Sequence, residues 1–121
     1  MSAIQESGEM YLETIYILSQ KSSTVRSVDV AEYMGYSKPS VSRGINVLKK
    51  DGLVDMDESR HLTLTAEGKK RAMKIYERHT VLSQLLISIG VDEKTATEDA
   101  CRVEHYISDK TFDAIKAHMQ K

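Results

Sequence analysis

The sequence predicts a mainly α-helical protein built in two parts. Apolar residues recur at the three- and four-residue spacing of helices over most of the chain, and Ser, Asp, Gly and Pro signals divide this pattern into separate helices. A short stretch near residues 53–64 changes to a pattern typical of strands. The chain has 121 residues, and 40% of them are apolar, which is enough for a globular core.

The first two helices are marked mainly by their ends. The first is expected over about residues 8–20, capped by Ser7, with Leu12 among its apolar positions. The second is expected to be capped by Ser27. Gly35 should end it, because glycine readily adopts the left-handed conformation found after a helix.

The third helix has the clearest signals. Ser37 suits the N-cap, Pro39 lies in the first turn, where a missing N–H costs nothing, and Gly52 follows the end. The positions expected to face inward are Val41, Ile45 and Leu48. Two consecutive helices joined by a tight glycine-containing turn are typical of a helix-turn-helix.

A hairpin is expected directly after this pair of helices. Residues 53–56 and 61–64 are the strand candidates, and residues 57–60 form the turn between them. A hairpin in this position corresponds to the wing of a winged helix-turn-helix.

The rest of the chain predicts three more helices. Thr65 is expected to cap a long one that ends at Gly90, and Asp92 a second one that continues through Cys101 to about Ile107. Ser108 or Asp109 should cap the last. We therefore expect a winged helix-turn-helix domain over residues 1–63 and an all-helical domain over residues 64–121. The second domain looks too small for a good independent core, so a second copy is expected to complete its burial.

The outward face of the third helix carries residue types that read DNA. Arg can hold a guanine through two hydrogen bonds, Asn can reach an adenine or a phosphate, and other basic side chains suit phosphates. The candidate DNA-binding residues are Arg26, Ser27, Ser37, Pro39, Ser40, Ser42, Arg43, Asn46, Lys49 and Arg60. Arg43 is the expected guanine reader. Any solvated helix carries similar residues, so the prediction depends on the order of the elements.

A second constellation suggests a metal site. Cys101, Glu104 and His105 form a C-x-x-E-H pattern that would share one face of a helix. A thiolate, a carboxylate and an imidazole together are a set of transition-metal ligands. The segments that could complete the set contain His79, Met10 and Glu13. A structural cysteine beside solvated polar residues is the alternative interpretation.

Charge and composition exclude several other classes. The 17 basic and 18 acidic residues give a net charge of −1, which excludes a polybasic or an acidic tail but not a local basic surface on a dimer. The single cysteine indicates a reducing compartment, and no apolar run approaches the ~20 residues of a membrane span. The N-terminus also lacks the basic region of a signal peptide. We expect a cytoplasmic protein without membrane contacts.

Five segments of the sequence resemble one known family. These segments are EMYLETIYIL, SKPSVSRGINVLKKDGLV, LTLTAEGKK, ERHTVLSQLLISIGVDE and EDACRVEHYISD. They cover nearly the whole chain and resemble the diphtheria-toxin-repressor and manganese-transport-regulator family of metal-dependent transcriptional repressors. The resemblance implies a helical dimerisation domain and a dimer that binds palindromic double-stranded operators of metal-homeostasis genes. It also implies a response to Fe(II) or Mn(II), with Zn, Co or Ni as substitutes in vitro, and no organic cofactor.

The resemblance also implies a ligand set. The residues on ligand positions of the iron-responding members are Met10, Cys101, Glu104 and His105. Glu13 matches a ligand of the manganese type, and His79 matches a ligand position in both branches. The two sulfur donors favour Fe(II), whereas the carboxylates suit Mn(II) as well.

Three departures from the family pattern affect what can be carried over. The chain ends at Lys121, so a short form without the third, SH3-like domain is expected. Ser83 and Thr97 occupy positions that complete an ancillary metal site in the iron type, and neither is a good ligand. Arg43 stands where the iron type has Gln, which changes the expected operator.

Three other functions compete with this one. The main alternative is a metal-independent winged-helix regulator that senses a small organic ligand. An enzyme using Cys101 as nucleophile and His105 as base lacks an oxyanion loop and a third orienting group, so we expect no catalysis. A pure protein-interaction module would show no salt-dependent binding to duplex DNA.

Overall fold

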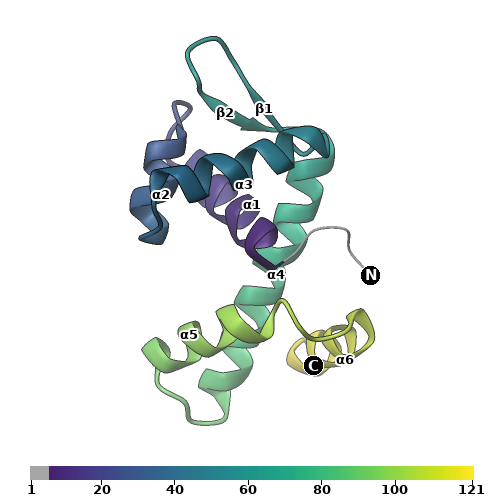
Figure 1. Ribbon diagram of the computed structural model, residues 1–121. Helices are drawn as coiled ribbons and strands as arrows, with labels where there is room; N and C mark the ends of the chain where they lie inside the picture. The colour runs from purple at the N-terminus through teal and green to yellow at the C-terminus, as the bar shows by residue number, and fades with distance from the viewer. Residues whose placement is uncertain (1–5) are drawn as a thin grey trace. The chain divides into compact units, whose positions relative to one another are not determined.

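The computed structural model describes the backbone of residues 6–121 and the side chains from Gly8 onward. These residues form six helices and one two-stranded sheet (Figure 1). The order is α1 (Glu6–Ser19), α2 (Ser27–Met34), α3 (Lys38–Lys50), β1 (Val54–Met56), β2 (Leu62–Leu64), α4 (Ala66–Ser88), α5 (Glu93–Val103) and α6 (Asp109–Met119). The predicted fold class, mainly α with a winged helix-turn-helix, is confirmed.

The chain divides into two compact units. The first ends at Met73, and the second runs from Lys74 to Lys121. Helix α4 begins in the first unit and ends in the second. No helix among the described residues is long and apolar enough to cross a membrane.

The first unit is held together by apolar side chains on the inner faces of its helices and strands. The three positions predicted on α3 are all buried, namely Val41, Ile45 and Leu48. They join one cluster with Leu12 and Ile15 of α1. Burying a side chain of this size contributes about 1.5–3 kcal/mol to stability. The cluster therefore fixes α3 against α1 and leaves its polar face outward.

The start of α1 lies two residues before the predicted position, and the N-cap of α2 lies one residue before it. Helix α1 begins at Glu6, so Ser7 lies inside it rather than before it. The N-cap of α2 is Arg26, not Ser27, because the Arg26 backbone N–H donates to Asp29 Oδ2 at 2.9 Å and so finds its partner within the first turn.

The start of α3 follows the prediction. Gly35 ends α2 with φ = 72°, and Ser37 Oγ accepts from the Ser40 backbone N–H at 3.3 Å. Pro39 lies in the first turn, where no helical N–H is required. These residues make the turn between α2 and α3 tight.

The wing is a short antiparallel hairpin in which Val54 pairs with Leu64 and Met56 with Leu62. Each strand is one residue shorter than expected, since Leu53 and His61 lie outside the pairing. Figure 1 shows the loop of the hairpin extending beyond α3.

The base of the wing is anchored to the helices on both sides. The Leu62 backbone N–H donates to Val25 O at 2.7 Å, just before α2. The Thr65 hydroxyl caps α4 by accepting from the Gly68 N–H at 3.0 Å and itself donates to Gly52 O at 2.7 Å. Gly68 is required here because a Cβ would overlap the Leu53 carbonyl.

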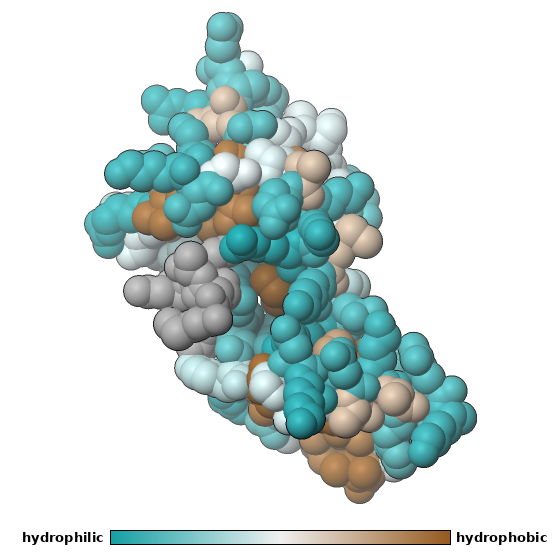
Figure 2. All heavy atoms as spheres, turned by 90° about the vertical axis from the view of Figure 1, so that its right-hand side faces the viewer, coloured by the Kyte–Doolittle hydropathy of each residue, from teal (hydrophilic) through white to brown (hydrophobic). Residues whose placement is uncertain are grey.

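The second unit contains the end of α4 with α5 and α6. Asp92 and Ser108 cap the two later helices, each accepting a backbone N–H three residues on. The unit leaves large apolar side chains exposed: Ile87 at 45% and Ile89 at 69%. Figure 2 shows hydrophobic surface at the end of this unit, where α4 turns into α5 in Figure 1. Exposed apolar surface of this kind is typical of a contact with another protein surface.

Candidate functional site

Helix α3 presents the predicted reading residues to solvent. Ser37, Pro39, Ser42, Arg43, Asn46 and Lys49 are exposed, and Ser40 is half-buried. Their backbone is fixed by the buried face of the same helix. The face can therefore meet DNA without rearrangement of the core.

An open groove lies between α3 and the wing. Six of the ten candidate DNA-binding residues line it: Arg26, Ser27, Ser42, Asn46, Lys49 and Arg60. These residues come from the start of α2, from α3 and from the tip of the hairpin. The first unit thus brings together residues that are up to 34 positions apart in the chain.

Short polar contacts order the start of the reading face. Ser37 Oγ donates to Ser40 Oγ at 2.8 Å, and Ser40 Oγ accepts from an Arg43 guanidinium nitrogen at 3.4 Å. These contacts direct the guanidinium along the outer face of α3. The remaining Arg43 donors are available for an acceptor such as the edge of a guanine.

A second polar cluster lies at the edge of the groove. An Arg26 guanidinium nitrogen lies 3.4 Å from His61 Nε2, and the His61 backbone N–H donates to Asp57 Oδ1 at 2.8 Å. This donated hydrogen bond is the main reason that the pKa of Asp57 is lowered. The cluster holds the wing loop beside the N-terminus of α2.

The second unit brings His79 and Glu104 together. His79 Nδ1 on α4 lies 3.0 Å from Glu104 Oε2, and the Glu104 side chain is 0% exposed. The other oxygen, Glu104 Oε1, accepts no hydrogen bond from any described residue, although His105 Nε2 lies 3.4 Å away. A buried carboxylate oxygen without a hydrogen bond is costly unless a cation neutralises it.

The predicted helix through Glu104 and His105 is wrong. Helix α5 ends at Val103, and Glu104 is its C-cap, with its N–H donating to Ala100 O at 2.9 Å. The N–H groups of Tyr106 and Ile107 both donate to Val103 O, so the chain turns instead of continuing the helix. Cys101 remains in the last turn of α5, half-buried.

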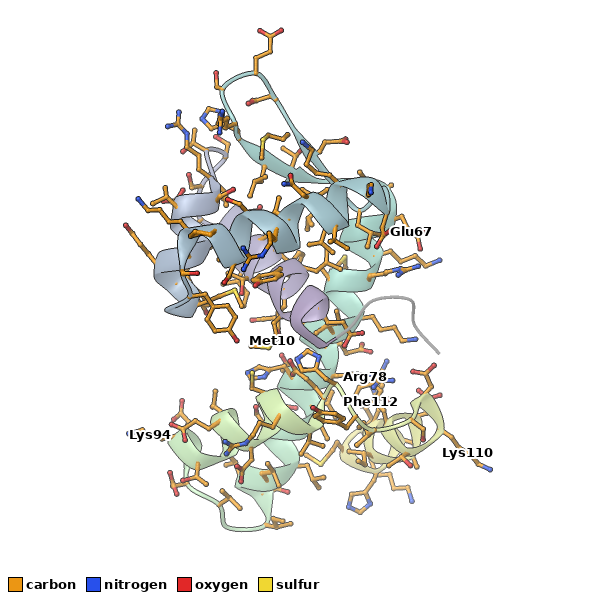
Figure 3. All side chains as sticks on the ribbon, in the orientation of Figure 1. Met10, Glu67, Arg78, Lys94, Lys110 and Phe112 are labelled. Atoms are coloured by element: carbon orange, nitrogen blue, oxygen red, sulfur yellow. The ribbon has the colours of Figure 1, made fainter. Side chains whose placement is uncertain are left out.

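Arg78 fixes the turn that carries Glu104. Its guanidinium donates to Glu104 O at 3.1 Å and to Ile107 O at 2.8 Å, and it also pairs with Asp109. The guanidinium carbon lies 5.3 Å from the centre of the Phe112 ring, which Figure 3 shows beside it. No local sequence pattern predicts this role, because the partners of Arg78 lie 26 to 31 residues away.

Two further predicted ligands belong to the first unit. Met10 and Glu13 are on α1, in the first unit, with Met10 half-buried and Glu13 7% exposed (Figure 3 labels Met10). In the second unit, taken alone, no three His, Cys, Asp or Glu ligand atoms lie within 4.8 Å of one another. Of the two ancillary positions, Thr97 is exposed and Ser83 Oγ is buried.

Two family models match consecutive parts of the chain. Residues 3–62 match the family model described as the iron dependent repressor N-terminal DNA binding domain. Residues 65–121 match the iron dependent repressor metal binding and dimerisation domain.

Relatives of both metal types are found. The chain is 37% identical over 111 residues to the transcriptional regulator MntR of Escherichia coli O6:H1, covering 92% of this chain and 72% of that protein. It is 34% identical over 110 residues to the iron-dependent repressor IdeR of Mycobacterium leprae, covering 90% of this chain and 48% of that protein.

A solved structure extends the match to three dimensions. A manganese-dependent transcriptional repressor in complex with manganese aligns with a TM-score of 0.87 and 28% identity, over 93% of this chain and 52% of that one. The chain thus spans about half the length of this protein and of IdeR.

These matches favour metal dependence over the alternative of a metal-independent regulator that senses an organic ligand. They confirm the resemblance to the diphtheria-toxin-repressor and manganese-transport-regulator family. The chain belongs to this iron-dependent repressor family, whose members are Fe(II)- or Mn(II)-dependent transcriptional repressors that bind operator DNA as dimers.

Proposed function

We propose that this chain binds Fe(II) or Mn(II) at a site built around Glu104 and, when loaded, represses metal-homeostasis genes by operator binding through α3. The observation that carries the proposal is the Glu104 carboxylate. It is fully buried, one oxygen lies beside His79, and the other accepts no hydrogen bond from the described part of the chain. Such a group fits a divalent cation, because the cation would neutralise the buried charge.

The proposal needs ligands beyond His79 and Glu104, since transition-metal sites in proteins use at least three protein donors. We assign Cys101 and His105 from the second unit and Met10 and Glu13 from α1. Glu13 supports this assignment because it is one of the few buried carboxylates among the described residues. Cys101 supports it because it lies one turn before Glu104.

The donor set allows both metals of the family. Nitrogen and carboxylate oxygen suit Fe(II) and Mn(II) alike, and the sulfur atoms of Cys101 and Met10 favour Fe(II). A bound divalent ion would supply positive charge at Glu104. Zn, Co and Ni are expected to compete in vitro, since they accept the same donors.

On the DNA side, we assign Arg43 and Asn46 to base edges, with Ser37, Pro39, Ser40 and Ser42 packing beside them. Arg26, Ser27, Lys49 and Arg60 are assigned to phosphates. The groove between α3 and the wing supports this division, because it places the proposed phosphate contacts around the reading helix.

We further propose a functional division into a DNA-binding domain over residues 1–63 and a metal-binding and dimerisation domain over residues 64–121. The protein would act in the cytoplasm, where its operators lie, and by binding rather than catalysis. Cys101 and His105 therefore have ligand roles and no catalytic role.

A selection experiment tests this function and does not require a defined operator. Random duplexes are enriched on the purified protein with Mn(II) and, in parallel, with a chelator. The proposal predicts a palindromic sequence enriched only with the metal. Equal enrichment with the chelator would show a DNA-binding protein that responds to another signal, and no enrichment in either arm would contradict operator binding.

A further inference from the structure

The buried ring of Tyr11 connects α1 to the reading helix. Tyr11 is 6% exposed and lies in the core cluster of the first unit with Ile45 of α3. Its ring packs directly against the backbone of α3 at Gly44. A Cβ at that position would overlap Tyr11 Cδ2 and Cε2 and would lie 2.9 Å from Cζ.

Tyr11 also touches the turn that precedes α3. The Tyr36 ring meets it edge to face, with centroids 6.2 Å apart and planes at 90°. Tyr36 immediately precedes Ser37, the N-cap of α3. The Tyr11 ring therefore contacts both the residue before the N-cap of α3 and the second turn of that helix.

The contact between Tyr11 and Gly44 lies next to a residue proposed to read DNA. Gly44 follows Arg43 directly, and Arg43 lies close enough to Tyr11 for its charge to act on the phenol. Helix geometry by itself does not require a glycine at position 44. Glycine in a helix interior is less favourable than alanine, so its presence here is explained by the close approach of the ring.

We propose that Tyr11 is a positioning residue for operator recognition, which sets the height and rotation of α3, and with them the Arg43 guanidinium, by filling the space at Gly44. The inference rests on the proposed reading role of Arg43. Tyr11 itself does not contact DNA, because it is buried under α3. Its ring is the part that matters, since the ring rather than the hydroxyl meets Gly44.

The test uses the full chain with Mn(II) and a duplex selected on the wild-type protein. The variants are Gly44→Ala, Tyr11→Leu and Tyr11→Phe, and affinity is measured on operator duplexes substituted one base pair at a time. Gly44→Ala is expected to weaken operator binding about tenfold, because relief of the overpacked methyl group would displace α3 from the position in which Arg43 reaches its base. Most of the loss should concern the base pair whose preference Arg43→Ala also relaxes.

The other variants separate positioning from general stability. Tyr11→Phe keeps the ring and should bind within about twofold of wild type, a small change on the affinity scale. Tyr11→Leu should relax the same base preference and add nothing further in an Arg43→Ala background, because it acts through Arg43. Non-specific duplex binding, which depends on phosphate contacts, should be unchanged in all of them.

Two results would overturn the inference. One is wild-type affinity and base preference in both Gly44→Ala and Tyr11→Leu. The other is an equal loss at every base pair with a lowered melting temperature, which would make Tyr11 a core residue only. A wild-type protein without metal-dependent operator binding would instead contradict the proposed function, so the two failures are distinguishable.

Discussion

His79 on α4 and Glu104 at the end of α5 hold each other through Nδ1 and Oε2, 3.0 Å apart, with the carboxylate fully buried. A buried carboxylate carries a large desolvation cost, and one histidine offsets it on one oxygen only. A divalent cation bound here, as proposed, would offset the rest. In the proposed function, this pair would link metal occupancy to the packing of α4 against the end of α5.

Removal of the Glu104 charge should abolish the metal response. Glu104→Gln keeps the size of the side chain but loses a ligand oxygen, so we expect metal affinity to fall by at least about 100-fold, beyond the loss seen for outer-shell groups. The measurement is operator binding against Mn(II) concentration. The matched control is Glu98→Gln, because Glu98 is an exposed carboxylate on the same helix. Undiminished stimulation in Glu104→Gln would refute the site.

Loss of the Arg43 guanidinium should change recognition at one base pair. Arg43→Ala is expected to cost about 1–3 kcal/mol at that position and to relax its preference. Lys49→Ala, on the same helix, should weaken all operator variants alike and reduce the salt dependence, as phosphate contacts do. Affinities on a panel of single-substituted duplexes distinguish the two. A uniform loss in Arg43→Ala would make it a phosphate contact instead.

The elements of the first unit could be predicted from the sequence because each has a local cause. Ser37 and Gly35 act through their own backbone neighbours, and the inward positions of α3 repeat at helical spacing. The end of α5 could not be predicted, because Arg78 fixes the following turn from 26 residues away. No spacing rule reveals a contact of that kind.

The candidate metal site could be predicted only in part, for a similar reason. Helical spacing places Cys101, Glu104 and His105 on one face, but the structure ends the helix before two of them. Glu104 and His79 meet through tertiary packing. Their residue types suggest metal ligands, but the sequence pattern does not show that the two side chains lie together.

Arg78 should be important for the stability of the second unit. Its side chain is 12% exposed and donates to two backbone carbonyls, of Glu104 and Ile107. Arg78→Met keeps much of the apolar length but leaves these carbonyls without their donor, so we expect a loss of about 2–4 kcal/mol in unfolding free energy. Arg102→Met is the control, since Arg102 is 72% exposed and its ion pair with Asp99 lies at the surface, where such pairs contribute little. Chemical denaturation measures both, and equal stability of the two variants would contradict the role of Arg78.

The free energy of unfolding should also depend on pH through the Asp109 carboxyl group. Hydrogen bonding and charge from Lys74, together with the charge of Arg78, lower the pKa of Asp109 below its usual 3.8. A carboxyl with a lowered pKa stabilises the fold above its unfolded pKa and loses this effect as the pH falls through the folded value. The difference in unfolding free energy between wild type and Asp109→Asn should therefore be constant above about pH 5 and shrink below about pH 4. A difference that does not change with pH would show that the carboxylate charge contributes nothing.

The most direct test of metal sensing is anaerobic calorimetric titration of the wild-type protein and of Cys101→Ala with Fe(II), Mn(II) and Zn(II). We predict saturable binding of Fe(II) and Mn(II) by the wild type and weaker binding by the variant, with the larger loss for Fe(II), because sulfur favours the softer ion. Absence of binding by all three ions would contradict metal sensing and leave a winged-helix DNA-binding protein that responds to a different signal.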